Sequence, residues 1–317
     1  WTTAERLAIY EREAPPLGTA AARAAVNAYA ERTEQAEETL LDAVTHLVVV
    51  SCTGFFAPGL DFVIAQELGL APTVGRTIVG FMGCCAAFNG LRTASQIVAG
   101  DPDACVLVVA VELCSLHIQP GTRRVDLVSA SLFADGAAAA LVGLPTEGDG
   151  GDFRIDGFRT YMKPNTADQM AWRIGNHGFT LRLSPRIPDH LADVAPAALD
   201  ALTAGRPPQF WAIHPGGRAI VDALQTLFAL TDDDVAATRS ILRRYGNLSS
   251  ATILFVLTAT AELLAAAQEN ATGIAMAFGP GLTVEMAQLT YIAEPVDREF
   301  PVETEGANMF ADAPRPA

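Results

Sequence analysis

Basic residues are scarce in this chain of 317 residues, which has 21 Lys and Arg against 36 Asp and Glu and a formal net charge of −15. Surfaces that bind nucleic acid need a cationic patch to neutralise phosphates. The composition therefore argues against nucleic acid as a partner. It also means that any anionic substrate must be met by a local group of cations.

Long apolar runs and paired-cysteine motifs are lacking too. A membrane span needs about 18 uncharged residues, and the longest candidate, 251–267, contains Glu262. The five cysteines show no C-x-x-C spacing, so we expect no metal site, no disulfide framework and a cytoplasmic location. No signal peptide is recognisable. Because the chain opens on Trp1 inside a helical pattern, we expect an N-terminal segment to be missing.

Strand-like and helix-like segments alternate along the chain. Continuous β-branched runs are typical of buried parallel strands, and Gly and Pro clusters separate them from helical patterns. We predict strands at 46–51, 74–79, 105–111, 137–143, 153–160, 210–213, 274–278 and 283–292. We predict helices at 5–13, 20–32, 61–68, 125–133, 189–202, 218–228, 232–245 and 249–267, and one directly after Cys84.

The alternation divides at the Gly-rich loop 148–151 into two similar halves, residues 1–147 and 148–317. Two such halves packed together give an α/β fold with five layers, αβαβα, and buried central helices. The helix after Cys84 and the helix at 249–267 are the candidates for the central layer. The segment after 294 is rich in Pro, Glu and Ala, and we expect a flexible tail there.

Cys84 lies at the junction between a Gly-bounded turn and a small-residue helix. A thiol in the first turn of a helix faces free N–H groups and the positive end of the helix dipole, which favour the thiolate. Gly80 and Gly83 leave room for another molecule to approach. Taken alone, such a cysteine is more often a small core residue than a nucleophile.

Two further segments carry polar side chains at junctions of the same kind. His214 follows a short buried strand and precedes Pro-Gly-Gly, and Asn247 precedes the most apolar helix. Alone, His214 is better interpreted as a hydrogen-bonded strand-end residue and Asn247 as a helix N-cap. Thiol, imidazole and carboxamide together suit acyl transfer through a thioester, with the His and Asn N–H groups stabilising an enolate or oxyanion.

Several motifs occur in a recognisable order. They are GC at 83–84, GLR at 90–92, LFADGAAA at 132–139, HPGG at 214–217, YGNLSS at 245–250 and FGPGLTVE at 278–285. With them, the chain from about residue 1 to 292 resembles a type III polyketide synthase of the chalcone and stilbene synthase family. The resemblance implies the thiolase fold and a homodimer. It also implies a starter acyl-CoA and malonyl-CoA as substrates, with no bound cofactor.

The resemblance also assigns roles to residues. It implies that Cys84 carries the growing acyl chain and that His214 and Asn247 promote malonyl decarboxylation and stabilise the enolate. Phe133 and Phe278 match the gatekeepers between the coenzyme A tunnel and the reaction cavity, although ordinary core aromatics would be the favoured interpretation of each without that context. The expected substrate-binding positions of the cavity also include Cys52, Cys114, His117, Trp172, Leu181 and Ser249.

Departures from the plant enzymes concern the cavity and the coenzyme A site. Cys52, Trp172 and Leu181 replace a threonine, a glycine and a phenylalanine of plant members, so we expect a cavity of another shape. The segments 80–84 and 111–117 look like those of bacterial members, several of which take fatty acyl starters and release alkylpyrones or alkylresorcinols. The family's basic residues for the coenzyme A phosphates fall largely before Trp1, which leaves Arg6 as an uncertain contributor.

Two alternatives remain open at this point. A β-ketoacyl synthase III shares the fold and the Cys-His-Asn trio but condenses once. A non-catalytic acyl-binding subunit could keep the same fold. Glu112 ends a buried strand, where it either hydrogen-bonds behind the site or serves a turn. Cys85 follows the nucleophile and is expected to be a packing residue.

Overall fold

The computed structural model describes residues 1–119, 121–122, 124–144 and 150–294. The first sheet has the strand order β2 (Gly75–Gly80), β1 (His46–Ser51), β3 (Val106–Leu113) and β4 (Asp135–Val142). Strand β1 runs parallel to β2 and β3, and β4 runs antiparallel to β3. Every residue of β3 is buried, because the sheet is covered on both faces and β-branched side chains pack well there.

The second sheet has the order β5 (Asp152–Met162), β10 (Thr283–Ile292), β9 (Ala271–Gly279) and β8 (Trp211–Ile213). Strand β8 is parallel to β9, whereas β9 and β5 are antiparallel to β10. Each half therefore combines parallel strands with an antiparallel return. The predicted strands are all present, with ends shifted by at most three residues.

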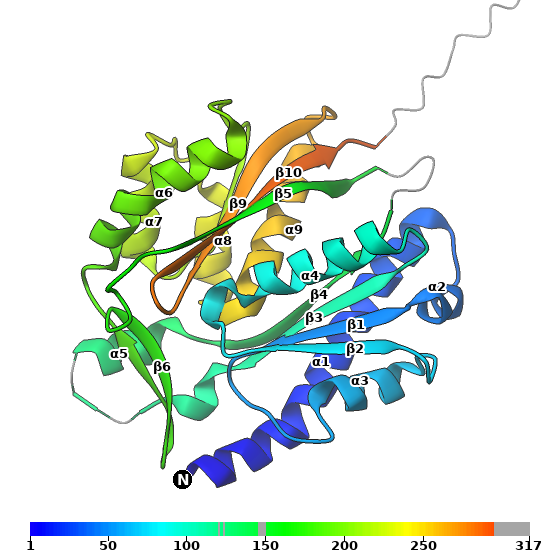
Figure 1. The fold of residues 1–317 in the computed structure, drawn as a ribbon, viewed down its shortest axis with the longest axis horizontal. Helices are drawn as coiled ribbons and strands as arrows, with labels where there is room; N and C mark the ends of the chain where they lie inside the picture. The colour runs from blue at the N-terminus through cyan, green and yellow to red at the C-terminus, as the bar shows by residue number, and fades with distance from the viewer. Residues whose placement is uncertain (120, 123, 145–149, 295–317) are drawn as a thin grey trace, which may run out of the picture.

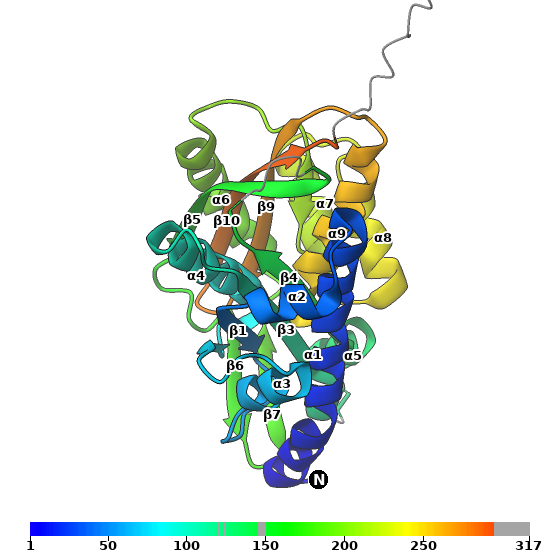
Figure 2. The ribbon, with the colours of Figure 1, turned by 90° about the vertical axis from the view of Figure 1, so that its right-hand side faces the viewer.

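The two sheets enclose a central layer formed by α4 (Ala86–Gly100) and α9 (Thr252–Ala265), as Figures 1 and 2 show. The side chains of β1 alternate between the two faces of the sheet. Val48 and Val50 pack on α4, whereas Leu47 and Val49 pack on α1 and α3 (Leu60–Leu68). In the second sheet, Ala275 and Ala277 face the central layer. Its other face packs on α6 (Ile187–Thr203) and α7 (Arg218–Leu227). This is the five-layered αβαβα arrangement predicted from the sequence.

Helix α1 (Thr3–Thr33) corrects the prediction of two helices at 5–13 and 20–32, because it runs unbroken through Pro15 and Pro16. Two prolines in a helix interior remove two backbone hydrogen bonds. The buried face continues across them, however, through Tyr10, Ala14, Pro15, Gly18, Ala22 and Val26. Packing of that face against the first sheet outweighs the local signal. The short helix α2 (Glu37–Ala43) then leads into β1.

The hairpin of β6 (Met170–Gly175) and β7 (Gly178–Leu183) is an element that the sequence analysis missed. It is a separate two-stranded sheet that projects beside the N-terminus of α1 (Figure 1). The remaining helices, α5 (Arg124–Leu132) and α8 (Ala236–Tyr245), agree with the prediction within four residues. The predicted domain boundary at 147/148 and the tail after 294 lie outside the described residues. None of the helices in the described part of the chain is long and apolar enough to cross a membrane.

Candidate active site

Cys84 lies in the 3₁₀ turn η1 (Gly83–Cys85), directly before α4. Gly83 has φ +76°, and a Cβ there would come 2.2 Å from Cδ of Pro280 in the other half of the molecule. Phe81 also has a positive φ of 57°, which is costly for a bulky residue and is typical of functional turns. Cys85 is fully buried in a hydrophobic cluster, and its thiol donates to the carbonyl oxygen of Met82 at 3.3 Å. The packing role expected for Cys85 agrees with this geometry.

The surroundings of Cys84 correct the prediction of a resting thiolate. Burial of the sulfur raises the pKa of the Cys84 thiol to about 11, and the Glu112 carboxylate adds to the increase. Hydrogen bonding with the side chains of Ser249 and Asn247 lowers this pKa, but by less. Desolvation outweighs the helix-end effect because the charged form loses its water. The residue is nevertheless only partly buried as a whole, so a reagent can reach it.

Asn247 is held by its backbone as well as by its side chain. Its N–H donates to Leu132 O at 2.8 Å, and its carbonyl oxygen accepts from Ala134 N–H at 2.9 Å, next to Phe133. Its Oδ1 accepts from the N–H of Ser249 at 2.9 Å, at the start of the 3₁₀ turn η3 (Ser249–Ala251) that leads into α9. Asn247 is thus not the N-cap expected from the sequence, since the N-cap residues are Leu248 for η3 and Ala251 for α9. Its Oδ1 holds the Ser249 N–H, which leaves the amide nitrogen for Cys84.

His214 follows β8 and is almost fully buried. Its backbone N–H donates to Met276 O at 2.8 Å, which fixes it against β9. Neither ring nitrogen has a hydrogen-bond partner among the described residues, and burial lowers the pKa of the imidazole to about 3. Buried polar groups normally have partners. An unpaired, neutral imidazole is thus available to a ligand.

Strand β9 connects His214 with the turn that carries Cys84. Beyond Met276 the strand continues to Gly279, where a Cβ would come 2.4 Å from the Cys85 sulfur and 2.8 Å from Met82 O. Glycine at 279 therefore permits close contact between the two halves. The trio comes from both halves. Cys84 and Asn247 lie within hydrogen-bonding reach of each other. His214 lies at the end of β8 beside Met276 of β9, and the contact at Gly279 is three residues further along β9.

The Glu112 carboxylate accepts three hydrogen bonds from two segments near Cys84. It accepts from Cys52 N–H at 3.0 Å, from Thr53 Oγ1 at 2.8 Å and from Ser250 Oγ. Full burial raises the pKa of Glu112 in spite of these donors. Of the two roles left open for Glu112, the structure supports hydrogen bonding behind the site. Sequence reasoning missed Thr53 and Ser250, although both directly follow positions that it had selected.

Several predicted cavity residues form one cluster. The Cys52 sulfur accepts from Gly83 N–H at 3.1 Å, next to Cys84, and the Trp172 indole donates to Cys52 O at 2.8 Å. His117 stacks on Phe179 with ring centroids 3.9 Å apart. Leu181 lies opposite Trp172 in the hairpin. Phe179 was missed because its hairpin was missed.

The remaining predicted positions differ in their surroundings. Cys114 is buried in η2 (Cys114–His117), and this burial raises the pKa of its thiol, with smaller contributions from Glu112 and Cys84. Phe133 pairs with Asn247. Phe278 is buried among side chains of α6 and the outer face of the second sheet, the packing role that the sequence left as an alternative. The gatekeeper roles of Phe133 and Phe278 therefore stay predictions.

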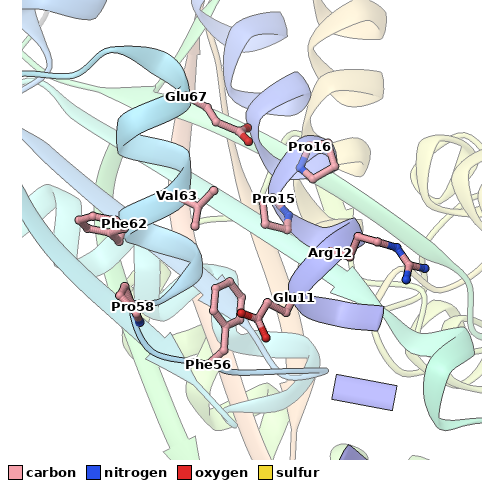
Figure 3. A pocket seen from close by; sticks show the side chains of 9 residues that line it. All are labelled: Glu11, Arg12, Pro15, Pro16, Phe56, Pro58, Phe62, Val63 and Glu67. Carbon is pink, nitrogen blue, oxygen red and sulfur yellow. The ribbon is translucent and has the colours of Figure 1, made fainter. Parts of the chain in front are cut away.

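A surface hollow of about 380 Å³ lies between α1 and α3 and contains none of the predicted site residues (Figure 3). A second hollow of about 290 Å³ includes Gly80 and Phe81 of the segment before Cys84. The Arg6 guanidinium donates to Leu116 O, so this cation already has a protein partner. Within the described ranges, no group of three or more His, Cys, Asp or Glu is arranged to hold a metal ion.

Comparisons with known proteins agree with this geometry. The family model for the N-terminal domain of chalcone and stilbene synthases matches residues 2–145, and that for their C-terminal domain matches residues 158–293. The chain is 36% identical over 247 residues to the alpha-pyrone synthesis polyketide synthase-like Pks18 of Mycobacterium tuberculosis (strain ATCC 25618 / H37Rv), covering 75% of this chain and 63% of that relative. It is 34% identical over 259 residues to type III polyketide synthase C of Arabidopsis thaliana, covering 77% and 67% of the two chains.

Solved structures give the same picture. The 1,3,6,8-tetrahydroxynaphthalene synthase of Streptomyces coelicolor A3(2) superimposes with a TM-score of 0.81 and 30% identity, over 92% of this chain and 82% of that one. PKS-I from the brown alga Ectocarpus siliculosus gives a TM-score of 0.83 and 31% identity, over 92% and 78% of the two chains.

Proposed function

Because this chain belongs to the chalcone and stilbene synthase family, we propose that it acts as a type III polyketide synthase. In this role it condenses a starter acyl-CoA repeatedly with malonyl-CoA and releases a cyclised pyrone, resorcinol or related product. The observation that carries the proposal is the sulfur of Cys84 within hydrogen-bonding reach of Asn247 and Ser249, together with the buried, unpaired imidazole of His214. Coenzyme A thioesters are the substrates, and no bound cofactor is required.

The protonation states suggest the order of events at the sulfur. With a thiol pKa of about 11 and an imidazole pKa of about 3, both groups are neutral at pH 7. His214 takes the thiol proton as the sulfur attacks the thioester carbonyl of the starter, and the coenzyme A thiolate leaves and is protonated. The starter is then held on Cys84 as a thioester.

The extension step uses the same polar groups. Malonyl-CoA loses carbon dioxide, and the enolate oxygen accepts hydrogen bonds from His214 and Asn247. The enolate carbon attacks the thioester on Cys84, which forms the new carbon–carbon bond and frees the sulfur. Removing one donor to such an oxyanion typically costs about 3 kcal/mol in the activation barrier.

A Cys84→Ala variant tests the assignment, with Cys85→Ala as the matched control that removes the neighbouring thiol. Each variant is incubated with acyl-CoAs of several chain lengths and labelled malonyl-CoA, and products are identified by mass spectrometry. We expect product from Cys85→Ala and none from Cys84→Ala. Equal turnover by both variants would remove the nucleophile assignment, and a single condensation in every product would favour a β-ketoacyl synthase III.

A homodimer is the expected assembly, and the edge strand β2 suits its interface. Ile78 on β2 and Phe55 beside it are each 53% exposed, and Met82 is 43% exposed. An uncovered apolar edge is usually paired or blocked. We expect wild-type protein to sediment as a dimer and Ile78→Lys as a monomer. The five cysteines are free, which supports a cytoplasmic location.

A further inference from the structure

The β6–β7 hairpin depends on other elements for its position. It is a sheet of only two strands, and such a hairpin is at best marginally stable alone. Its outer side is open, with Ile174 55% exposed. A few contacts along its strands and at its tip, the turn between Gly175 and Gly178, therefore determine the position of the hairpin.

Two hairpin residues, Trp172 in the middle of β6 and Phe179 next to the turn, hydrogen-bond segments of the candidate active site. The Trp172 indole donates to Cys52 O, and the Phe179 N–H donates to Nδ1 of His117 at 3.1 Å. The Nε2 of His117 in turn hydrogen-bonds Thr53 O at 2.6 Å. Through Cys52 and Thr53, these contacts join the hairpin to the segments that surround Cys84 and Glu112.

The tip is held by one side chain at the start of α1. The Thr3 hydroxyl accepts from Gly178 N–H at 2.9 Å and donates to Gly175 O, so it joins both strand ends across the turn. The backbone N–H of Thr3 donates to Asn176 O at 2.9 Å. A further donor comes from Gln119, whose amide reaches His177 O at 3.1 Å and Phe179 O at 3.3 Å. Figures 1 and 2 both show the hairpin tip beside the N-terminus of α1.

From these contacts we propose that the β6–β7 hairpin is an adjustable wall of the acyl-binding chamber and that Thr3 is a positioning residue that holds this wall in place. This inference rests on the proposed function for its substrates. Trp172 and Phe179 are the hairpin side chains that contact the catalytic end. A tip released from Thr3 lets this wall move outward, so longer acyl chains are accepted on Cys84. Thr3 itself does not touch the reacting atoms.

Thr3→Val tests the proposal, because valine keeps the shape and the backbone N–H but removes the hydroxyl. The Thr2–Glu5 capping box of α1 remains intact. Thr3→Ser restores the hydroxyl and should restore wild-type behaviour. Thr226→Val is the matched control, since the Thr226 hydroxyl bonds only within α7, to Asp222 O at 2.9 Å.

The first measurement is amide hydrogen exchange at Gly178 and Phe179. Losing the Thr3 hydroxyl should accelerate exchange there roughly tenfold in Thr3→Val, with no change in Thr226→Val. The second is the rate of Cys84 alkylation by iodoacetamide and by its N-decyl analogue, with the site identified by mass spectrometry. We expect the long-to-short rate ratio to rise about tenfold. Both measurements are independent of condensation, so they remain informative if the proposed function fails.

The third measurement is kcat/KM for dodecanoyl-CoA relative to butyryl-CoA as starter. This ratio should rise in Thr3→Val and return to the wild-type value in Thr3→Ser. A general loss of folding would not give such a rescue. If Thr3→Val does not fold, Gln119→Met weakens the same tip and is expected to act in the same direction. Unchanged hairpin exchange, or an unchanged long-to-short alkylation ratio, in folded Thr3→Val protein would overturn the proposal.

Discussion

At the scale of single residues, the site combines buried groups whose pKa values move in opposite directions. Burial raises the pKa of the Cys84 thiol to about 11 and lowers that of the His214 imidazole to about 3. Each group is therefore neutral before substrate binds. In the proposed mechanism, charge separation between them accompanies the attack on the thioester, when Asn247 and Ser249 can stabilise the sulfur.

The buried His214 makes stability depend on pH. The unfolded chain binds a proton on this imidazole below pH 6.5, whereas the folded chain does so only near pH 3. The stabilisation is fully present above about pH 6.5 and is lost as the pH falls toward 3. Protonation of this imidazole in the unfolded chain therefore lowers the unfolding free energy by about 2 kcal/mol between pH 7 and pH 5. Urea titrations should show a smaller loss of unfolding free energy over this pH range in His214→Gln. The variant His177→Gln, at an exposed position, should lose as much as the wild type.

Glu112 is expected to suppress the reactivity of Cys84. Its carboxylate raises the pKa of the thiol, so Glu112→Gln should shift the pH dependence of Cys84 alkylation to lower pH. A shift of one pKa unit makes alkylation roughly tenfold faster at pH 8. The rate is followed by mass spectrometry of the labelled peptide. The control Glu67→Gln removes a carboxylate that bonds Thr19 at 2.6 Å, away from the site. Slower alkylation of Cys84 in Glu112→Gln than in the wild type would contradict the electrostatic argument.

At the scale of elements, α4 lies unusually close to the first sheet at Gly90. A Cβ there would come 2.8 Å from Val50 Cγ2 and 3.2 Å from Val108 Cγ1. Gly90→Ala should therefore destabilise the protein by about 1–3 kcal/mol, although alanine is the better helix former by about 1 kcal/mol. Gly100→Ala, in open space at the end of the same helix, should be neutral or slightly stabilising. Thermal unfolding of the two variants compares the effects directly.

The sequence predicted elements where local pattern and tertiary packing agree. The apolar runs of β1 and β3 fall in this class, as do α4 and α9. It failed for α1, where the buried stripe from Tyr10 to Val26 overrides Pro15 and Pro16. It also failed for the β6–β7 hairpin, whose position comes from distant partners such as Thr3 and His117. Contacts with such distant residues leave no periodic pattern in the sequence.

The candidate site divides in the same way. The motifs predict Cys84, His214 and Asn247 as the catalytic residues, and this assignment stays a prediction. The thiolate that the helix end favours at Cys84 is opposed by burial, which raises the pKa of the thiol. Helix-end geometry is visible in a sequence, whereas the loss of water around a sulfur depends on residues from both halves. For the same reason Thr53 and Ser250 were recognised only once Glu112 was seen to bind them.

At the scale of the whole molecule, a buried ion pair joins the two halves. Arg92 on α4 bonds Glu285 on β10, and Asn89 and Thr160 also donate to this carboxylate, Thr160 at 2.7 Å. Glu285 is 1% exposed. Burying a carboxylate requires such partners.

The effects of removing the two partners of this pair should not be additive. Arg92→Met leaves the Glu285 carboxylate buried without its cation, so we expect a loss of about 3 kcal/mol in unfolding free energy. The double variant Arg92→Met/Glu285→Gln should lose less than the sum of the single variants. A thermodynamic cycle from denaturant titrations measures the coupling. Strict additivity would mean that the pair contributes little to joining the halves.

The origin of the reacting groups on opposite halves has a consequence for diversification. Sulfur comes from the first half, whereas imidazole and carboxamide come from the second. Under the proposed function, a gene encoding either half alone would yield an inert product. Exchange of one half between relatives, in contrast, would combine a new environment of the thiol with the existing His214 and Asn247, and the hairpin of the second half would be inherited with these two residues.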